Sequence, residues 1–165
     1  MKFYFALTGL LFLAAFNNTT TDSSPSTAPI KPLTGIAAPQ NININIIGIY
    51  AHDTSAYTQG LEIYKGKLYE STGDYINSSL RITDIKTGKV EQKHMMGSAD
   101  IFGEGITIFK DKIYQLTWKN HVVNVYDIKN IDKPIKTFTW PYEGWGITHN
   151  DTDLIISDGS SNLFF

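Results

Sequence analysis

The sequence predicts an all-β fold of the β-propeller type, and three observations support this prediction. One pattern of residues recurs three times along the chain, each copy alternates apolar and polar residues as strands do, and helical periodicity is absent. Repeats of about 40 to 45 residues that hold four short strands each are typical of propeller blades. A β-sandwich with accidental internal similarity is the alternative.

The repeat aligns without gaps over residues 60–73, 105–118 and 146–159. Each copy begins with a glycine followed by Leu or Ile, and successive copies start 45 and 41 residues apart. Apolar–polar alternation on both sides of a short polar turn predicts a β-hairpin in each copy. We expect the turns at Lys65-Gly66, Lys110-Asp111 and Asp151-Thr152.

A second motif repeats in step with the hairpins and predicts the outer strands. Residues 81–85 match residues 124–128, and the turn at residues 87–89 precedes an extended stretch over residues 90–92. Each repeat therefore holds about four strands. The alternation of Asn and Ile over residues 41–45 predicts one more half-buried strand at the start of the domain.

The chain divides into three parts. Lys2 and the apolar run that ends at Phe16 predict a signal peptide-like segment over residues 1–16, with an N-terminal core strand or helix as the alternative. Residues 17–40 are rich in Thr, Ser, Pro and Asn and predict a flexible polar linker, because they cannot bury enough apolar surface to fold. The propeller domain is expected over residues 41–165. We therefore expect an exported protein, periplasmic or extracellular, with a leader of bacterial type.

Composition excludes several classes of function. The chain has no cysteine, which rules out disulfides, thiolate nucleophiles and Cys-rich zinc sites, and argues against a lipid anchor in the membrane. The net charge of -2 offers no attraction for nucleic acid. The four histidines lack the spacing of a zinc motif, so no metal site is expected.

Length bears on the number of blades. At about 43 residues per repeat, residues 41–165 hold just under three blades, whereas closed propellers have ~4 to 8. We therefore expect an incomplete propeller domain in a truncated chain.

Functional groups of a propeller gather at equivalent positions of the repeats, because the inner strands surround a central channel. Glu70, Gln115 and Ile156 are equivalent, and Glu70 alone can ionise. In a desolvated setting Glu70 could act as a general acid and base. A hydrogen-bonded structural role is the alternative.

The residues before the repeat glycines form a second equivalent set, Gln59, Glu104 and Trp145. They predict either a pocket that orients a ligand over an aromatic wall or simple packing of turns, and spacing does not decide between the two. Trp118 and Trp140 are interpreted as core residues between blades.

A series of motifs gives the chain a family resemblance. The sequence resembles the glutaminyl-peptide cyclotransferases of the plant and bacterial type, also called glutamine cyclotransferases. The resemblance covers nearly all of residues 50–163, and its motifs are YTQGL at residues 57–61, LYESTG at 68–73, SSLR at 78–81, TGKV at 87–90, FGEGI at 102–106, YQLTWK at 114–119, EGWGI at 143–147 and SDGSS at 157–161.

The resemblance implies a five-bladed propeller that converts the N-terminal glutamine of peptides or proteins to pyroglutamate and releases ammonia without zinc or another cofactor. It also implies that Glu70, in the ESTG motif, is the catalytic acid and base, for which a pKa raised by burial would be suitable. The same resemblance implies that four residues bind substrate at the channel mouth, namely Gln59, Glu104, Trp118 and Trp145.

Two departures from the family pattern affect these expectations. Tyr57 stands where the family commonly has Phe, and the family's later blades, with a lysine that polarises the substrate carbonyl, have no counterpart in this chain. The chain alone is therefore expected to have little or no cyclase activity. A non-catalytic exported propeller that binds peptides or other ligands is the alternative function.

Overall fold

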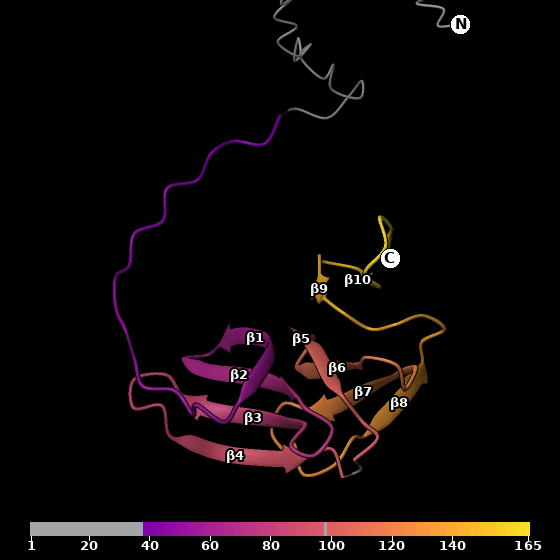
Figure 1. Cartoon of the computed structure of the whole chain (residues 1–165), viewed down its shortest axis with the longest axis horizontal. Coiled ribbons are helices and arrows are strands. Elements are labelled where there is room, and N and C mark those ends of the chain that lie inside the picture. Colours follow the sequence, from indigo (N-terminus) through magenta and orange to yellow (C-terminus); the bar gives the residue numbers. More distant parts are fainter. Residues whose placement is uncertain (1–37, 98) are drawn as a thin grey trace, which may run out of the picture. The chain divides into compact units, whose positions relative to one another are not determined.

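Eleven strands in three antiparallel sheets make up the regular structure of the described chain (Figure 1). The computed structural model describes residues 38–97 and 99–165, so the predicted signal peptide-like segment and most of the predicted linker lie outside the described residues. No helix in this described part is long and apolar enough to cross a membrane.

The strands of each sheet follow one another along the chain, as the repeat predicts for propeller blades. The first sheet contains β1 (Tyr57–Tyr64), β2 (Lys67–Gly73), β3 (Ser79–Asp84) and β4 (Val90–Met95). The second sheet contains β5 (Gly103–Phe109), β6 (Lys112–Thr117), β7 (Val122–Asp127) and β8 (Lys136–Thr139). The third sheet contains β9 (Ile147–His149), β10 (Leu154–Ser157) and β11 (Leu163–Phe164).

Two of the predicted hairpin turns have the backbone geometry of tight two-residue turns. Lys65 and Gly66 separate β1 from β2 with φ angles of 47° and 77°. Lys110 and Asp111 separate β5 from β6 with φ angles of 51° and 56°. Positive φ at both central residues fits the right-handed twist of the flanking strands, so both predictions are confirmed.

The third hairpin turns at the predicted residues Asp151 and Thr152, where the backbone N–H of Asn150 donates to the carbonyl of Asp153 (3.0 Å). β9 ends at His149 and β10 begins at Leu154. The side-chain oxygen of Asn150 accepts hydrogen bonds from the backbone N–H groups of Thr152 (2.8 Å) and Asp153 (2.6 Å). The side chain of Asn150 thus stabilises the turn by accepting backbone hydrogen bonds, as asparagine commonly does in turns.

The pairing of strands confirms the repeat alignment. The three residues at the Glu70 position each lie opposite the residue after a repeat glycine, in the pairs Glu70 with Leu61, Gln115 with Ile106 and Ile156 with Ile147. Equivalent residues in sequence are therefore equivalent in the sheets.

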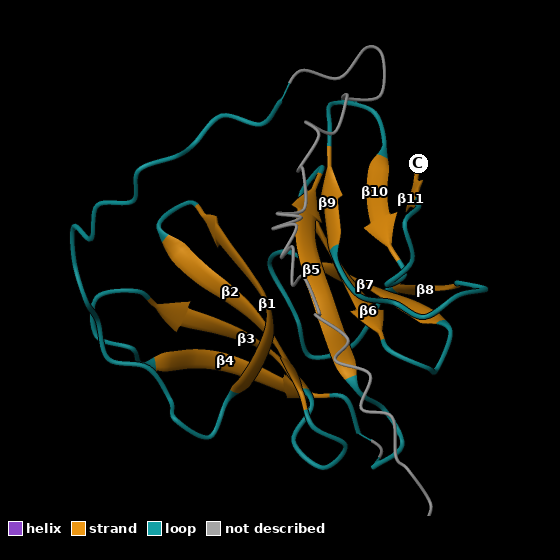
Figure 2. Cartoon of the chain, turned by 45° about the horizontal axis from the view of Figure 1, so that its top comes forward, coloured by secondary structure: helices purple, strands orange, loops and turns teal. Residues whose placement is uncertain are grey.

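The first strands of neighbouring sheets contact each other, β1 with β5 and β5 with β9 (Figure 2). The repeat glycines make this approach possible. A Cβ atom on Gly60 would collide with the backbone nitrogen of Ile106, and one on Gly105 would collide with the carbonyl oxygen of Trp145. The N–H of Gly105 instead donates a hydrogen bond of 2.9 Å to that carbonyl.

Two apolar clusters hold the sheets together. The cluster between the first two sheets consists of Tyr69, Leu80, Ile82, Ile106, Ile108, Ile113, Tyr126 and Ile131. The cluster between the second and third sheets consists of Leu116, Val123 and Ile156, with Trp140 packed against it. Burial of these side chains is the main source of stability for such an arrangement.

A fully buried glutamine also joins the first two sheets. The amide nitrogen of Gln115 donates to the hydroxyl of Ser71 (2.8 Å) and to the carbonyl of Ser79 (3.3 Å), and its oxygen accepts from Tyr126 (3.2 Å). Because the nitrogen and the oxygen of the Gln115 side-chain amide both have hydrogen-bond partners, this polar side chain can be buried beside the apolar cluster.

Residues 41–45 form no strand, so that prediction is wrong. Ile42 and Ile44 are 85% and 88% exposed. Alternation produces a strand only where another strand supplies hydrogen bonds and a packed face, and none of the described strands pairs with this stretch. The first strand begins at Tyr57.

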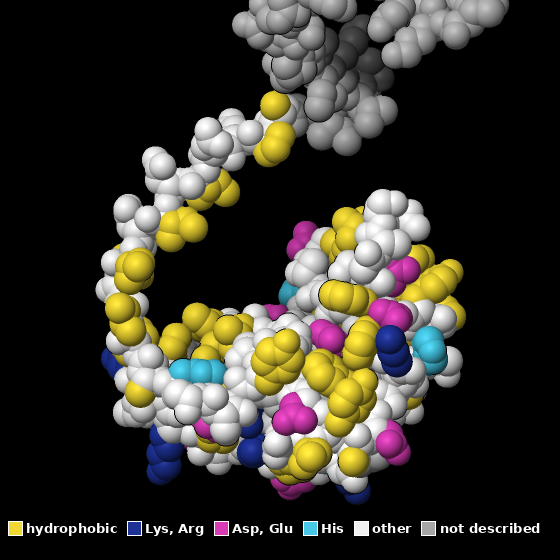
Figure 3. All heavy atoms as spheres, viewed as in Figure 1, with side chains coloured by type: hydrophobic (Ala, Val, Ile, Leu, Met, Phe, Trp, Pro, Cys, Tyr) yellow, Lys and Arg dark blue, Asp and Glu magenta, His cyan; other side chains and the backbone are white. Residues whose placement is uncertain are grey.

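The face of the first sheet that points away from the second sheet carries exposed apolar side chains. Leu61 and Ile63 of β1 are 56% and 63% exposed, and hydrophobic side chains gather over β1 in the space-filling view (Figure 3). Leu61 lies directly opposite Glu70. Since opposite residues share a face, Glu70 belongs to this face of the sheet.

Candidate active site

A pocket of about 350 Å³ lies where β1 and β5 begin, a size typical of small-molecule sites. Its lining consists of Tyr57, Gln59, Phe102, Glu104, Trp118 and Trp145. The structure therefore brings together all four residues for which a substrate-binding role is predicted. Glu70 is not part of this lining.

Two β-bulges contain the polar residues of the pocket. In β1 the register with β2 shifts between Thr58 and Gly60, which leaves Gln59 as the extra residue. In β5 the corresponding shift lies between Gly103 and Ile106 and includes Glu104. A bulge changes the direction of the side chains near it, and bulges are common next to active sites.

Aromatic rings form most of the pocket wall. The ring of Phe102 lies edge-to-face with the ring of Tyr57 (centroids 6.2 Å apart) and with that of Trp118 (5.7 Å). Trp145 completes the wall and is 46% exposed. Trp118, interpreted from the sequence as a core residue, is half-buried and borders the pocket, whereas Trp140 packs against the apolar cluster as predicted.

Glu104 lines this pocket and has a pKa well above its ordinary value. Its side chain is buried, and burial raises its pKa to about 7, with a further contribution from the negative charge of Glu143. Burial penalises the charged carboxylate, and no hydrogen bond from the described residues compensates for it. Near neutral pH Glu104 can therefore both accept and release a proton.

Three residues of the site were not predicted from the sequence to take part in it: Tyr57, Phe102 and Glu143. They occupy one repeat position, two residues before the set Gln59, Glu104 and Trp145. Tyr57 and Phe102 line the pocket, and Glu143 accepts hydrogen bonds from the indoles of Trp118 and Trp145. The repeat alignment contained this signal, because a second equivalent position beside the first is expected to reach the same end of the blades.

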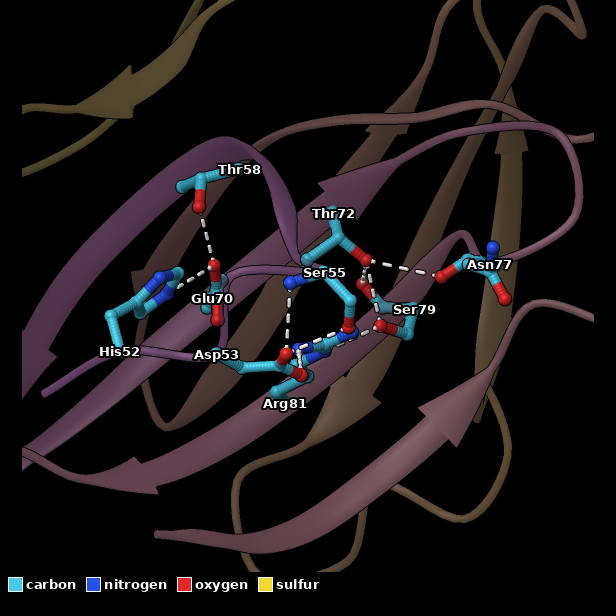
Figure 4. Close-up of polar contacts among 9 residues, drawn as sticks. All are labelled: His52, Asp53, Ser55, Thr58, Glu70, Thr72, Asn77, Ser79 and Arg81. Carbon is cyan, nitrogen blue, oxygen red and sulfur yellow. Dashed lines mark hydrogen bonds and ion pairs between the residues drawn. The ribbon is translucent and has the colours of Figure 1, made fainter. Parts of the chain in front are cut away.

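Glu70 has a different environment (Figure 4). It is 1% exposed, and one carboxylate oxygen accepts a hydrogen bond from the hydroxyl of Thr58 and lies 3.0 Å from Nε2 of His52. Thr58 precedes the bulged residue Gln59. Glu70 therefore holds the beginning of β1 and the segment before it against β2.

A second polar group on the same face fixes this segment further along (Figure 4). The buried guanidinium of Arg81, opposite Glu70 in β3, donates to Asp53 (2.8 Å) and to the hydroxyl of Ser79 (2.9 Å). Hydrogen bonds from Ser55, assisted by Arg81, lower the pKa of Asp53 to about 2. A charged Asp53 thus neutralises the buried arginine.

Within the described residues, no group of three or more His, Cys, Asp or Glu side chains is arranged to hold a metal ion. The polar side-chain groups that line the pocket include the carboxyl of Glu104, the amide of Gln59 and the hydroxyl of Tyr57. These groups can bind a polar organic ligand by hydrogen bonds.

Fold and pocket together define a β-propeller protein with a buried carboxyl group inside an aromatic pocket. Comparison with known proteins then identifies the family. The model of the glutamine cyclotransferase family matches residues 11–165, and the chain belongs to this family.

Two relatives illustrate the similarity. A glutaminyl-peptide cyclotransferase of Arabidopsis thaliana is 39% identical over 124 residues, which cover 73% of this chain and 38% of that protein. The crystal structure of Myxococcus xanthus glutaminyl cyclase matches with a TM-score of 0.64 and 31% identity, over 72% of this chain and 49% of that one. The chain thus spans less than half the length of each of these two relatives, and the predicted β-propeller class is confirmed.

Proposed function

We propose that this chain carries the glutamine-binding pocket of a glutaminyl-peptide cyclotransferase, and that Glu104, in place of the predicted Glu70, is the general acid and base. The observation that carries the proposal is the position of Glu104 in the lining of the aromatic pocket, from which Glu70 is absent; burial there also raises the pKa of Glu104 to about 7. Effective acid–base groups have pKa values near the working pH, and they must reach the reacting atoms.

The reaction is an acyl transfer within one residue. The α-amine of an N-terminal glutamine attacks the carbonyl carbon of its own side chain, a new C–N bond closes the five-membered ring, and the bond to the amide nitrogen breaks. Glu104 accepts the proton that the amine loses and returns a proton to the departing nitrogen, which leaves as ammonia. Atoms and charge balance without a further reagent.

The remaining lining residues would bind and orient the substrate. The flat amide of glutamine suits the faces of Trp118 and Trp145, and the side-chain amide of Gln59 can exchange hydrogen bonds with it. A bound conformation that brings amine and carbonyl together supplies much of the rate of such a cyclisation, because the reacting groups need only be held in place.

Glu70 would act at a distance from the chemistry. Its contact with Thr58 supports the bulge of Gln59, and one oxygen of its carboxylate contacts both Thr58 and His52. A structural role for Glu70, the alternative that the sequence left open, agrees with these contacts.

The test is ammonia release from a peptide with N-terminal glutamine, catalysed by a parent protein that spans the full length of the relatives and by two matched variants of it. We expect Glu104→Gln to lower kcat by about 10² to 10⁴ and Glu70→Gln to retain kcat within about tenfold while losing stability. A peptide that begins with asparagine, which would have to close a four-membered ring, is the substrate control.

Two results would contradict the proposal. If Glu70→Gln is folded but inactive while Glu104→Gln turns over, the acid–base role belongs to Glu70. If the parent protein binds the glutamine peptide and releases no ammonia, the chain is a peptide-binding propeller without cyclase activity.

A further inference from the structure

Glu143 lies between β8 and β9 and accepts hydrogen bonds from three tryptophans. Its carboxylate oxygen Oε2 accepts from the indole nitrogens of Trp118 (2.8 Å) and Trp145 (3.1 Å). Its backbone carbonyl accepts from the indole nitrogen of Trp140 (3.1 Å). These are all the tryptophans of the chain.

The two carboxylate contacts belong to the pocket. Trp118 follows β6 and Trp145 precedes β9, so the two rings come from different sheets. An indole has a single N–H, and a shared acceptor fixes the edge of both rings relative to each other. A charged acceptor makes each of these hydrogen bonds stronger than one between neutral groups.

Lys119 adds a second restraint on Trp118. Its ammonium lies 4.0 Å from the centroid of the Trp118 ring and 3.7 Å from the other carboxylate oxygen of Glu143. The ring is thus held at its edge by Glu143 and on one face by Lys119.

The charge of Glu143 also reaches the pocket acid. Hydrogen bonds from Trp118 and Trp145, and the nearby Lys119, hold the pKa of Glu143 below its usual value, so it is ionised at neutral pH. This negative charge contributes, after burial, to the raised pKa of Glu104. Glu143 therefore influences both the wall of the pocket and its acid–base group without lining it.

From this geometry we propose that Glu143 is a positioning residue of the glutamine site, which sets the angle between the two tryptophans that enclose the substrate side chain and adds a negative charge near Glu104. The inference rests on the proposed cyclase function for its meaning in catalysis. Its structural content, that one carboxylate holds both rings, is independent of that function.

The experiment compares Glu143→Ala with Glu143→Gln. Alanine removes both the acceptor and the charge, whereas glutamine keeps an acceptor oxygen and removes only the charge. We expect Glu143→Ala to raise KM for a glutamine peptide about tenfold, and Glu143→Gln to restore KM to within about threefold of the parent. In the pH profile of kcat/KM, Glu143→Gln is expected to shift the limb assigned to Glu104 to lower pH, because the neighbouring negative charge is gone.

Glu91→Gln is the matched control, since Glu91 is a partly exposed acid paired with Lys67 on the first sheet, as Glu143 is paired with Lys119. It should change neither KM nor the pH profile. Acrylamide quenching of tryptophan fluorescence supplies a readout that needs no turnover. Glu143→Ala should increase quenching, and Glu143→Gln should leave it near the parent value.

The outcomes separate this inference from the proposed function. A parent without cyclase activity would refute the proposed function, while the quenching comparison would still decide whether Glu143 holds the rings. If Glu143→Ala does not fold, the pH profile and quenching of Glu143→Gln decide the case. Parent-like quenching and KM in Glu143→Ala, or an unshifted pH profile in Glu143→Gln, would overturn the inference.

Discussion

The indole N–H groups of Trp118 and Trp145 donate to the same carboxylate oxygen, Oε2 of Glu143. The two tryptophans belong to successive repeats and line one pocket together with Phe102. The carboxylate of Glu143 therefore links two repeats and fixes the positions of these two rings relative to each other. The shared hydrogen-bond acceptor thus makes the pocket an organised site.

Stability should depend on pH through Glu104. Folding raises the pKa of Glu104 from its ordinary value of 4.5 to about 7, so its contribution to stability is full below pH 4.5 and is lost as the pH rises through about 7. Glu104→Gln stays neutral at every pH. We therefore expect the free energy of unfolding of this variant, relative to that of the parent, to increase from pH 5 to pH 8 by on the order of 1 to 3 kcal/mol. Urea unfolding at both pH values measures the gain.

Glu91→Gln serves as the control for that experiment, because Glu91 lies on the partly exposed surface of β4. A stability difference between Glu104→Gln and the parent that is equal at the two pH values would show that Glu104 does not titrate in this range.

Substitution of Gly73 should deform the pocket. A Cβ atom at Gly73 would overlap the ring of Phe102 and lie 3.0 Å from Cγ of Gln59. We expect Gly73→Ala to cost about 1 to 3 kcal/mol in stability and to raise KM for a glutamine peptide, because two lining residues must move. Thermal unfolding and steady-state kinetics measure the two effects.

Gly66→Ala is the comparison for this prediction. Gly66 has a φ of 77° in the turn between β1 and β2, and no atom lies within 4 Å of an added Cβ. Its replacement should cost about 1 kcal/mol through backbone strain and leave KM unchanged. Equal effects of the two alanines on KM would argue against a link between Gly73 and the pocket.

Loss of the buried amide between the first two sheets should be costly. Gln115→Ala would leave the hydroxyls of Ser71 and Tyr126 without this partner and create a cavity. We expect a loss of about 2 to 4 kcal/mol, measured by urea unfolding. Gln92→Ala on the exposed β4 strand should change stability by less than about 0.5 kcal/mol. A small effect of Gln115→Ala would mean that the two sheets do not depend on this contact.

Much of the fold could be predicted because the signals were local. The glycine-led hairpins, the turn at Lys65-Gly66 and the equivalence of Glu70 and Gln115 follow from period-2 alternation and turn residues. The strand expected over residues 41–45 had the same alternation and failed, since alternation says nothing about whether a partner strand is available.

The sequence predicted which residues line the candidate site, but it did not predict the roles of its acidic residues as well. Repeat-equivalent positions gave Gln59, Glu104 and Trp145, and these residues do line one pocket. The ESTG motif drew attention to Glu70, but whether a carboxylate in a strand faces a pocket or a hydrogen-bonded interior depends on which segment covers it. Here His52 and Thr58, which precede β2 in the chain, contact the carboxylate of Glu70.

The sequence by itself determined the repeats, the hairpins and the family, because each depends on neighbouring residues or on motifs read in order. Tertiary structure alone decided that Glu70 lies outside the pocket lining and that Glu143 holds the pocket walls. Bulges in β1 and β5 lie at Gln59 and Glu104, and Glu143 joins rings from two sheets. A register shift of one residue reverses the direction of side chains, and the pKa of a carboxyl follows its burial, so both are properties of the packed sheets.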